Sequence, residues 1–416
     1  MRLEQQLLKY LFNRAVTAPW QLAGGNRQDY RAAIVIPALA EFWTLPRTLA
    51  SLAANPAGLL AETLVVVVVN NRAEAPALLR EENRATLAWL ATSSHSELQL
   101  ATIDASSAGL ALPVGEGVGL ARKIGFDAAL ARLDTRKQPL LISLDADTLV
   151  DANYLSAIFH HFDGHRTGGA VIPFRHQNGE SPEQEAAIRD YELYLRSYRF
   201  GLELAASPYA WHTIGSAFAC TAAAYVAAGG MNRRLAGEDF YFLQQLQKTT
   251  GVTPLAGTVV RPAARSSERV PFGTGQVIRA TVAGDGGRYQ WIAAGAFFLL
   301  KQWLAAVNAN PDAPADELLQ LAAGMSPQLA EFLDECRFGA IYQRLCANHP
   351  TCEGRRAAFH SWFDGLRTRR LLSRLTGAEA REPSATVADL LAAGGYAGVR
   401  GKSEQLRLLE SLQGCG

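Results

Sequence analysis

Five consecutive valines, residues 65–69, constrain the fold of this 416-residue chain more than any other feature. An unbroken run of β-branched residues is typical of a strand that is buried on both faces, as in a parallel sheet covered by helices. Between residues 32 and 260, short apolar runs alternate with helical patterns, as crossover connections between parallel strands require. We therefore predict an α/β fold with a buried, parallel sheet. Its predicted strands are residues 33–36, 63–69, 98–103, 140–144, 169–173, 216–220 and 258–260.

The β pattern ends near residue 279, and the remaining chain has helical patterns separated by breaks rich in Gly and Pro. We predict an N-terminal helical extension at residues 1–30, an α/β domain at residues 31–279 and a helical C-terminal region at residues 280–416. The apolar run at residues 291–300 is shorter than the roughly 20 residues that a transmembrane helix needs. Residues 291–307 are therefore predicted to form a buried helix, and no transmembrane segment is expected.

The composition excludes some classes of protein. The chain has 40 Lys+Arg and 39 Asp+Glu, a formal charge of +1, so binding of nucleic acid through bulk positive charge is not expected. The 49% of hydrophobic residues excludes a disordered chain. Five widely spaced cysteines without a C-x-x-C pair predict neither a structural zinc site nor a redox site, and they fit a reducing compartment. With no evident signal peptide, the expected location is the cytoplasm.

Two carboxylates follow the predicted strand at residues 140–144. Asp145 and Asp147 are two positions apart, so in extended backbone both side chains point to one side. Open α/β sheets bind ligands at the carboxyl ends of their strands. Carboxylates this close repel each other unless a cation neutralises them, and hard oxygen ligands suit Mg²⁺ or Mn²⁺, which bridge phosphate oxygens. A D-x-D pair also occurs in ordinary loops, so its context has to decide.

Other polar residues follow the neighbouring elements. The first strand ends in Pro37-Ala38 and is followed by Glu41, and the second ends in Asn70-Asn71. A Gly-rich loop then opens a helix that carries Arg122, and Gly237 precedes the acidic pair Glu238-Asp239 at the start of another helix. Amide groups at a helix start and a guanidinium favour an anion, here a diphosphate. The acidic pair alone is also what the helix dipole favours without any function.

Taken in order, these elements resemble the GT-A-fold glycosyltransferases over about residues 30–275. The order of the motifs is most similar to that of glycosyltransferase family 2. The resemblance implies the GT-A fold, a Rossmann-like and mostly parallel central sheet, here with a helical C-terminal region. It also implies a metal-dependent hexosyltransferase that moves a single sugar, with inversion, from a nucleoside-diphosphate sugar to a hydroxyl acceptor.

The resemblance further implies roles for individual residues. Pro37, Ala38 and Glu41 would line the nucleotide pocket, Asn70 or Asn71 would face the base, and Arg122 would approach the diphosphate. Asp145 would contact the ribose, and Asp145 and Asp147 would hold the metal, Mg²⁺ or Mn²⁺. Asp239 would be the catalytic base, which takes the proton of the acceptor hydroxyl, and Glu238 would position the acceptor.

The chain departs from the family pattern at three places. Family members usually carry Asn before the acid of the first motif and an Asp pair after the second strand, where this chain has Ala40 and Asn70-Asn71. The base is therefore not identified. The Q-x-x-R-W element of processive synthases is missing near residues 244–248 or later, which favours one sugar per encounter.

Arginines recur at positions 261, 265 and 269, before Phe-Gly-Thr-Gly. Arg265 and Arg269 predict a loop that closes over the diphosphate or an anionic acceptor, although surface arginines beside an ordinary turn fit the pattern equally well. Trp211 and His212 precede the strand at residues 216–220 and are predicted to line an acceptor pocket, with a packed aromatic core as the alternative.

Two other functions fit a related sheet. A sugar nucleotidyltransferase would open with a G-x-G-x-R-type loop after the first strand, and residues 37–41 have no such glycines. A non-catalytic nucleotide-sugar-binding module is disfavoured, because like charges gathered at one site cost stability unless they serve a function. The acceptor, the oligomeric state and a peripheral membrane contact of the helical region stay open.

Overall fold

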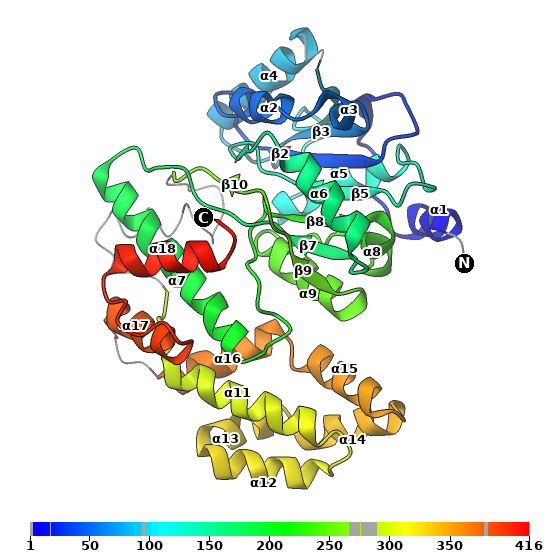
Figure 1. Cartoon of the computed structure of the whole chain (residues 1–416). Coiled ribbons are helices and arrows are strands. Elements are labelled where there is room, and N and C mark those ends of the chain that lie inside the picture. The colour runs from blue at the N-terminus through cyan, green and yellow to red at the C-terminus, as the bar shows by residue number, and fades with distance from the viewer. Residues whose placement is uncertain are drawn as a thin grey trace. The chain divides into compact units, whose positions relative to one another are not determined.

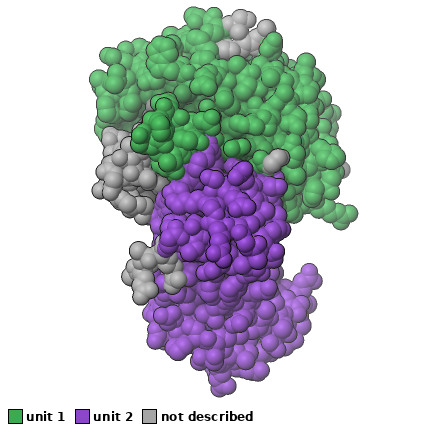
Figure 2. All heavy atoms as spheres, turned by 60° about the vertical axis from the view of Figure 1, so that its left-hand side comes forward, with its two compact units in different colours: residues 1–188, 213–282, 415 green, residues 189–212, 283–414, 416 purple. Residues whose placement is uncertain are grey.

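The computed structural model describes residues 3–16, 18–93, 97–265, 275, 289–377 and 382–415. They fall into two compact units, coloured green and purple in Figure 2. The first, here called the sheet unit, comprises residues 1–188, 213–282 and 415. The second, here called the helical unit, comprises residues 189–212, 283–414 and 416.

The sheet unit is built on an eight-stranded sheet in the order β1-β4-β3-β2-β5-β8-β7-β9 (Figure 1). The strands are β1 (Leu22–Gly24), β2 (Ala32–Ala38), β3 (Thr63–Asn70), β4 (Gln99–Ala105), β5 (Leu140–Ser143), β7 (Gly169–Val171), β8 (Phe218–Thr221) and β9 (Val252–Pro254). Strands β4, β3, β2 and β5 are parallel neighbours, and β7 is parallel to β9. Only β1 and β8 run antiparallel to their partners among the described strands of this sheet. The predicted buried and mostly parallel sheet is therefore confirmed.

The valine run forms most of β3, and every residue of this strand is buried. The helices of the sheet unit are α1 (Leu3–Asn13), α2 (Leu45–Ala53), α3 (Ala57–Ala61), α4 (Ala77–Thr92), α5 (Val118–Leu130), α6 (Tyr154–Gly164), α8 (Ala222–Ala227) and α9 (Glu238–Thr249), together with the first residues of α7 (Pro182–Leu204). Helices α4 and α5 both pack against β3, and α5 also packs against β2. A Cβ at Gly125 of α5 would lie 2.3 Å from Val35 Cγ1, so a glycine is required for this close approach of helix and sheet.

The prediction for residues 258–260 was wrong in its sheet assignment. The strand there is β10 (Val260–Arg261), which pairs antiparallel with β6 (Leu149–Val150) in a separate two-stranded sheet. Strands β1, β6 and β9 were not predicted, because two or three residues carry no readable periodicity. The β6–β10 pairing matters for the site, since it returns the chain to the residues that follow β5.

Every described element of the helical unit is a helix. They are the part of α7 (Pro182–Leu204) from residue 189 onward, α11 (Ala294–Ala309), α12 (Ala315–Met325), α13 (Pro327–Glu335), α14 (Phe338–Asn348), α15 (Cys352–Trp362), α16 (Gly365–Thr376), α17 (Pro383–Ala393) and α18 (Lys402–Leu412). Trp303 of α11 is fully buried between Phe338 and Phe359, with ring centroids 5.5 and 6.1 Å away. The buried helix predicted at residues 291–307 is confirmed. No helix in the described part of the chain is both long and apolar enough to cross a bilayer.

Candidate active site

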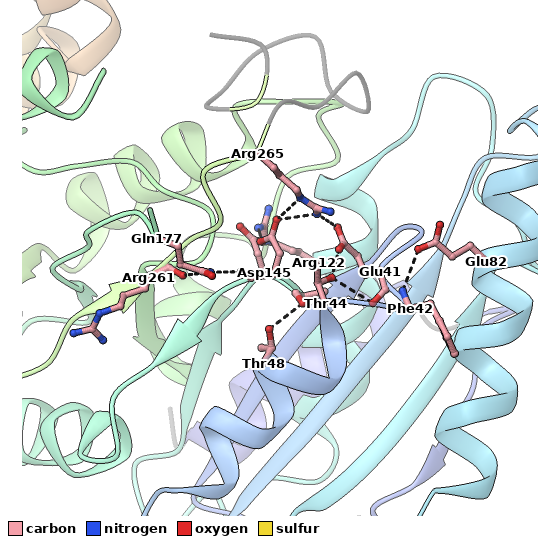
Figure 3. Close-up of polar contacts among 12 residues, drawn as sticks. Glu41, Phe42, Thr44, Thr48, Glu82, Arg122, Asp145, Gln177, Arg261 and Arg265 are labelled. Carbon is pink, nitrogen blue, oxygen red and sulfur yellow. Dashed lines mark hydrogen bonds and ion pairs between the residues drawn. The ribbon is translucent and has the colours of Figure 1, made fainter. Parts of the chain in front are cut away.

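The parallel strands β2, β3 and β5 end at one edge of the sheet, and the predicted site residues follow these ends. The D-x-D turn after β5 is held by three contacts. Leu144 N donates to Val35 O at 3.1 Å. Thr48 Oγ1 donates to Ala146 O and Gln177 Nε2 donates to Asp147 O, each at 2.9 Å; Thr48 and Gln177 are labelled in Figure 3. The backbone that carries Asp145 and Asp147 is therefore fixed by strand, helix and loop together.

Arg122 joins the sheet edge to the start of α9. Its side chain is 3% exposed, and its guanidinium forms ion pairs with Asp145 and Glu238. Its Nε donates to Ser143 Oγ at 3.0 Å, and Ser143 Oγ in turn donates to Gly215 O at 2.7 Å. Burial alone would lower the pKa of Arg122, but the carboxylates of Asp145, Glu238 and Asp239 outweigh it and raise this pKa. Arg122 is thus a buried, permanently charged link between two acidic segments.

Glu238 and Asp239 begin α9, as predicted from the sequence. The preceding Gly237 has a φ of 69°, a left-handed conformation that favours glycine. Glu238 O accepts from Asn232 Nδ2 at 2.7 Å, and Asp239 Oδ1 accepts from Phe240 N at 2.7 Å. Burial raises the pKa of Glu238, and Arg122 opposes this shift.

The carboxyl group of Asp239 titrates near neutral pH. Burial, followed by the neighbouring Glu238, raises its pKa to about 7, and Arg122 limits the rise. A carboxylate with a pKa near the working pH is well suited to accept a proton in a reaction.

Arg265 binds the second aspartate of the D-x-D pair. Its Nε and Nη2 lie 3.0 and 2.8 Å from Asp147 Oδ2, and Nη2 also forms an ion pair with Glu41 (Figure 3). Glu41 accepts a further hydrogen bond from Thr44 Oγ1. Arg265 reaches this place because β10 pairs with β6 just after the D-x-D turn. Burial and then Glu41 raise the pKa of Asp147 to about 6, whereas Arg265 lowers it.

The carboxylates of this edge outnumber the cationic groups that bind them. Among the residues that the structure describes, the guanidinium groups of Arg122 and Arg265 lie beside five carboxylates, an excess of three negative charges when all are ionised. The carboxylates are those of Glu41, Asp145, Asp147, Glu238 and Asp239. The raised pKa values of Asp147 and Asp239 are the physical consequence of this excess together with burial.

Only one pair of the described carboxylates at this edge, Glu41 and Asp147, fits a metal site. Among the described residues, no three His, Cys, Asp or Glu side chains are grouped as a metal cage. The two predicted ligands bind different arginines, Asp145 through Arg122 and Asp147 through Arg265. However, Mg²⁺ is usually held by one or two carboxylates together with water and phosphate oxygens. Glu41 and Asp147 already converge on one cationic group, so this pair fits such a site.

The residues predicted to face the nucleotide base are buried and bonded within the protein. Asn70 Nδ2 donates to Val68 O at 3.0 Å and to Ala38 O, and Asn71 Nδ2 donates to Arg72 O at 3.0 Å. Pro37 and Ala38 are buried at the end of β2. Contact of these residues with a nucleotide stays a prediction.

Sequence reasoning missed Asn83 of α4. Its side chain accepts from Ala40 N at 2.8 Å and donates to Asn70 O and to Asn71 Oδ1 at 2.9 and 2.7 Å. Ala40 has a φ of 52°, so Asn83 stabilises a strained turn directly before Glu41. An Asn on the buried side of a helix, in line with Thr86 and Leu90, was the signal that could have revealed it.

The remaining predicted residues either belong to the helical unit or fall outside the described part of the chain. Trp211 and His212 belong to the helical unit, where both are buried and His212 Nε2 lies 3.0 Å from Gln413 Oε1. Burial lowers the pKa of His212 well below its ordinary value. Their part in an acceptor pocket stays a prediction. Arg269 lies outside the described residues, whereas Arg261 forms an ion pair with Asp151.

The fold and its edge thus define an α/β protein with a concentrated acidic site at the carboxyl ends of parallel strands. No family model and no curated protein matches the chain. Solved structures of GT-A glycosyltransferases do match it over most of its length. They are S. aureus TarS 1-349 in complex with UDP-GlcNAc, the mannosyltransferase PcManGT from Pyrobaculum calidifontis in complex with GDP-Man and Mn²⁺, and GalNAc-T7 with UDP, GalNAc and Mn²⁺.

These likenesses are remote. TarS 1-349 is 11% identical with a TM-score of 0.41, and the match covers 82% of this chain and 92% of the TarS 1-349 chain. PcManGT is 17% identical with a TM-score of 0.39, covering 88% and 95%. GalNAc-T7 is 16% identical with a TM-score of 0.34, covering 57% and 44%. The function therefore has to be argued from the residues of the site.

Proposed function

We propose that the chain is a metal-dependent hexosyltransferase that moves one sugar, with inversion, from a nucleoside-diphosphate sugar to a hydroxyl acceptor. The observation that carries this proposal is a pair of carboxylates that can hold a metal ion together with a separate carboxylate that can act as a base. Glu41 and Asp147 converge on a cationic group, and Asp239, with a pKa of about 7, begins α9 next to the Arg122 link.

The donor side of the reaction needs positive charge. A nucleoside diphosphate is anionic and would be repelled by the five carboxylates unless a cation lay between them. Glu41 and Asp147 would hold Mg²⁺ or Mn²⁺, which neutralises the departing diphosphate when it is bound. Because Arg122 is engaged by Asp145, Glu238 and Ser143, we assign it the positioning of these carboxylates in place of the diphosphate contact expected from the sequence.

The acceptor side needs a base. The Asp239 carboxylate would take the proton of the acceptor hydroxyl as the new bond to the anomeric carbon forms and the bond to the diphosphate breaks. At pH 7 about half of the Asp239 side chains would be ionised. Glu238 raises the pKa of Asp239, so it makes the base stronger, and its own position is fixed by Arg122.

The test separates donor binding from transfer. UDP-GlcNAc and GDP-Man, with and without Mn²⁺, are added to the full chain, and the melting temperature and the release of nucleoside diphosphate are measured. We expect Asp147→Asn to abolish the Mn²⁺-dependent rise in melting temperature. We expect Asp239→Asn to keep donor binding and to lower transfer by at least about a hundredfold.

The matched control is Asp316→Asn, which removes an exposed carboxylate from the first turn of α12. This variant should bind and react as the unaltered protein does. Full transfer by Asp239→Asn would exclude Asp239 as the base. Release of pyrophosphate in place of nucleoside diphosphate would favour a sugar nucleotidyltransferase.

A further inference from the structure

We propose that Arg265 is an internal counter-cation that competes with the divalent metal for the oxygens of Glu41 and Asp147. This inference rests on the proposed function, because it names the metal site of that reaction. It replaces the pair expected from the D-x-D pattern, Asp145 and Asp147, by a pair drawn from two different strand ends. It also gives Arg265 a role that its sequence pattern does not predict.

The geometry places one cationic group on both carboxylates. Arg265 Nη2 contacts Glu41 as well as Asp147 Oδ2, and Nε makes a second contact to Asp147 Oδ2 at 3.0 Å. Asp145, by contrast, is committed to Arg122, whose guanidinium is fully surrounded. Glu41 and Asp147 are therefore the two carboxylates that share a cation with access to solvent, since the Arg265 side chain is 28% exposed and that of Arg122 is 3% exposed.

The two carboxylates are better fixed than the arginine. The Glu41 side chain is 9% exposed and is held by Thr44, and the Asp147 backbone is held by Gln177. The Arg265 side chain is 28% exposed, more than either carboxylate that it binds. Exchange of the cation at this place would therefore move the arginine and leave the oxygens where they are.

A metal ion and the guanidinium cannot bind these oxygens together. Glu41 Oε1 and Asp147 Oδ2 both contact Arg265 Nη2, so a divalent cation held by these two oxygens would have to displace this guanidinium nitrogen. Binding of the metal alone would then break the Arg265 contacts, so its affinity is reduced. A diphosphate supplies further oxygen ligands to the metal and an anionic partner for the released guanidinium. Metal and nucleotide are therefore expected to bind cooperatively.

The experiment measures Mn²⁺ binding to the full chain without nucleotide, from the loss of the free-ion EPR signal. It is done at pH 8, where Asp147, with a pKa of about 6, is ionised. We expect Arg265→Gln to bind Mn²⁺ about tenfold more tightly than the unaltered protein, within the usual range of coupling between two ligands. Arg265→Lys should lie between the two, since a lysine keeps the charge and loses the planar fork.

The matched control is Arg261→Gln. Arg261 lies four residues earlier and pairs with Asp151, outside the Glu41 and Asp147 pair, so its loss should leave Mn²⁺ affinity unchanged. The double variant Glu41→Gln/Arg265→Gln should lose the gain of the single one, which identifies Glu41 as a ligand. A thermal unfolding curve for each variant shows that it is folded.

Unchanged or weaker Mn²⁺ binding by folded Arg265→Gln would overturn the proposal. If the unaltered chain still binds a nucleoside-diphosphate sugar in that case, the glycosyltransferase function stands without the competition. If Arg265→Gln binds Mn²⁺ more tightly but no such donor binds to any variant, the competition stands and the proposed function fails.

Discussion

At the scale of single residues, the site stores unfavourable electrostatic energy. Asp239 has an ordinary pKa of 3.8, and in the folded chain this value is raised to about 7 by burial and by Glu238. The folded state therefore holds a proton that the unfolded state has already released between these two pH values. Stability falls as the pH rises from about 4 to 7 and stays reduced above that, because the buried carboxylate is then ionised.

The first residue-scale prediction follows from this sign. Asp239→Asn should raise the free energy of unfolding at pH 8 by about 1–2 kcal/mol, a figure reduced for the partial exposure of this side chain. At pH 4, which lies only just above the ordinary pKa of 3.8, most of this destabilisation has not yet developed, so the gain should be small. Melting curves at the two pH values check this, and a lower melting temperature of the variant at pH 8 would contradict it. Sugar transfer by Asp239→Asn should be lost at both pH values.

The residues of the site were largely predictable, but their partners were not. Strand ends and helix starts in the sequence identified Glu41, Asp145, Asp147, Glu238 and Asp239. The cation on Asp147 comes from Arg265, 118 positions later, through a register between two-residue strands that no local pattern encodes. The pairing of Arg122 with Glu238 likewise joins residues 116 positions apart. Contacts of this kind depend on the folded sheet and not on nearby sequence.

At the scale of elements, the position of Arg122 depends on how closely α5 approaches the sheet. A Cβ at Gly125 would meet Val35 Cγ1 at 2.3 Å and Val68 Cγ2 at 2.9 Å, both fully or almost fully buried. Neither valine has free space to move into, because β2 and β3 lie inside the sheet.

The element-scale prediction concerns this contact. Gly125→Ala should lower the free energy of unfolding by about 1–3 kcal/mol, the usual cost of overpacking, and should weaken transfer by displacing Arg122. Adding Val35→Ala should recover part of the loss, which a double-mutant cycle measured by chemical denaturation would show. Full additivity of the two losses would mean that the contact does not limit the approach.

Elements differed in how well the sequence predicted them. The apolar strands β2, β3 and β4 were located to within a few residues, because each carries several residues of a clear pattern. Strand β8 was predicted, but its antiparallel direction was not, since direction depends on the connection and not on the composition of the strand. Edge strand β1 has three residues and gave no signal.

At the scale of the whole molecule, the two units share one continuous helix. Helix α7 begins in the sheet unit, and from residue 189 onward it belongs to the helical unit. Its residues Leu193, Phe200 and Leu202 are 1%, 6% and 3% exposed within the core of that unit. The sequence placed the change of domain near residue 280, because the β pattern ends there, and periodicity cannot show that an earlier helix packs with later ones.

This sharing sets where the chain can be cut. A fragment that ends at residue 279 would keep α7 but lose the helices around it, so Leu193, Phe200 and Leu202 would face water as an apolar patch. We expect this fragment to aggregate, as size-exclusion chromatography would show, and a soluble monomer would contradict the expectation. An activity assay on a fragment cut at residue 279 would therefore show no transfer because the fragment aggregates, and not because its site lacks activity.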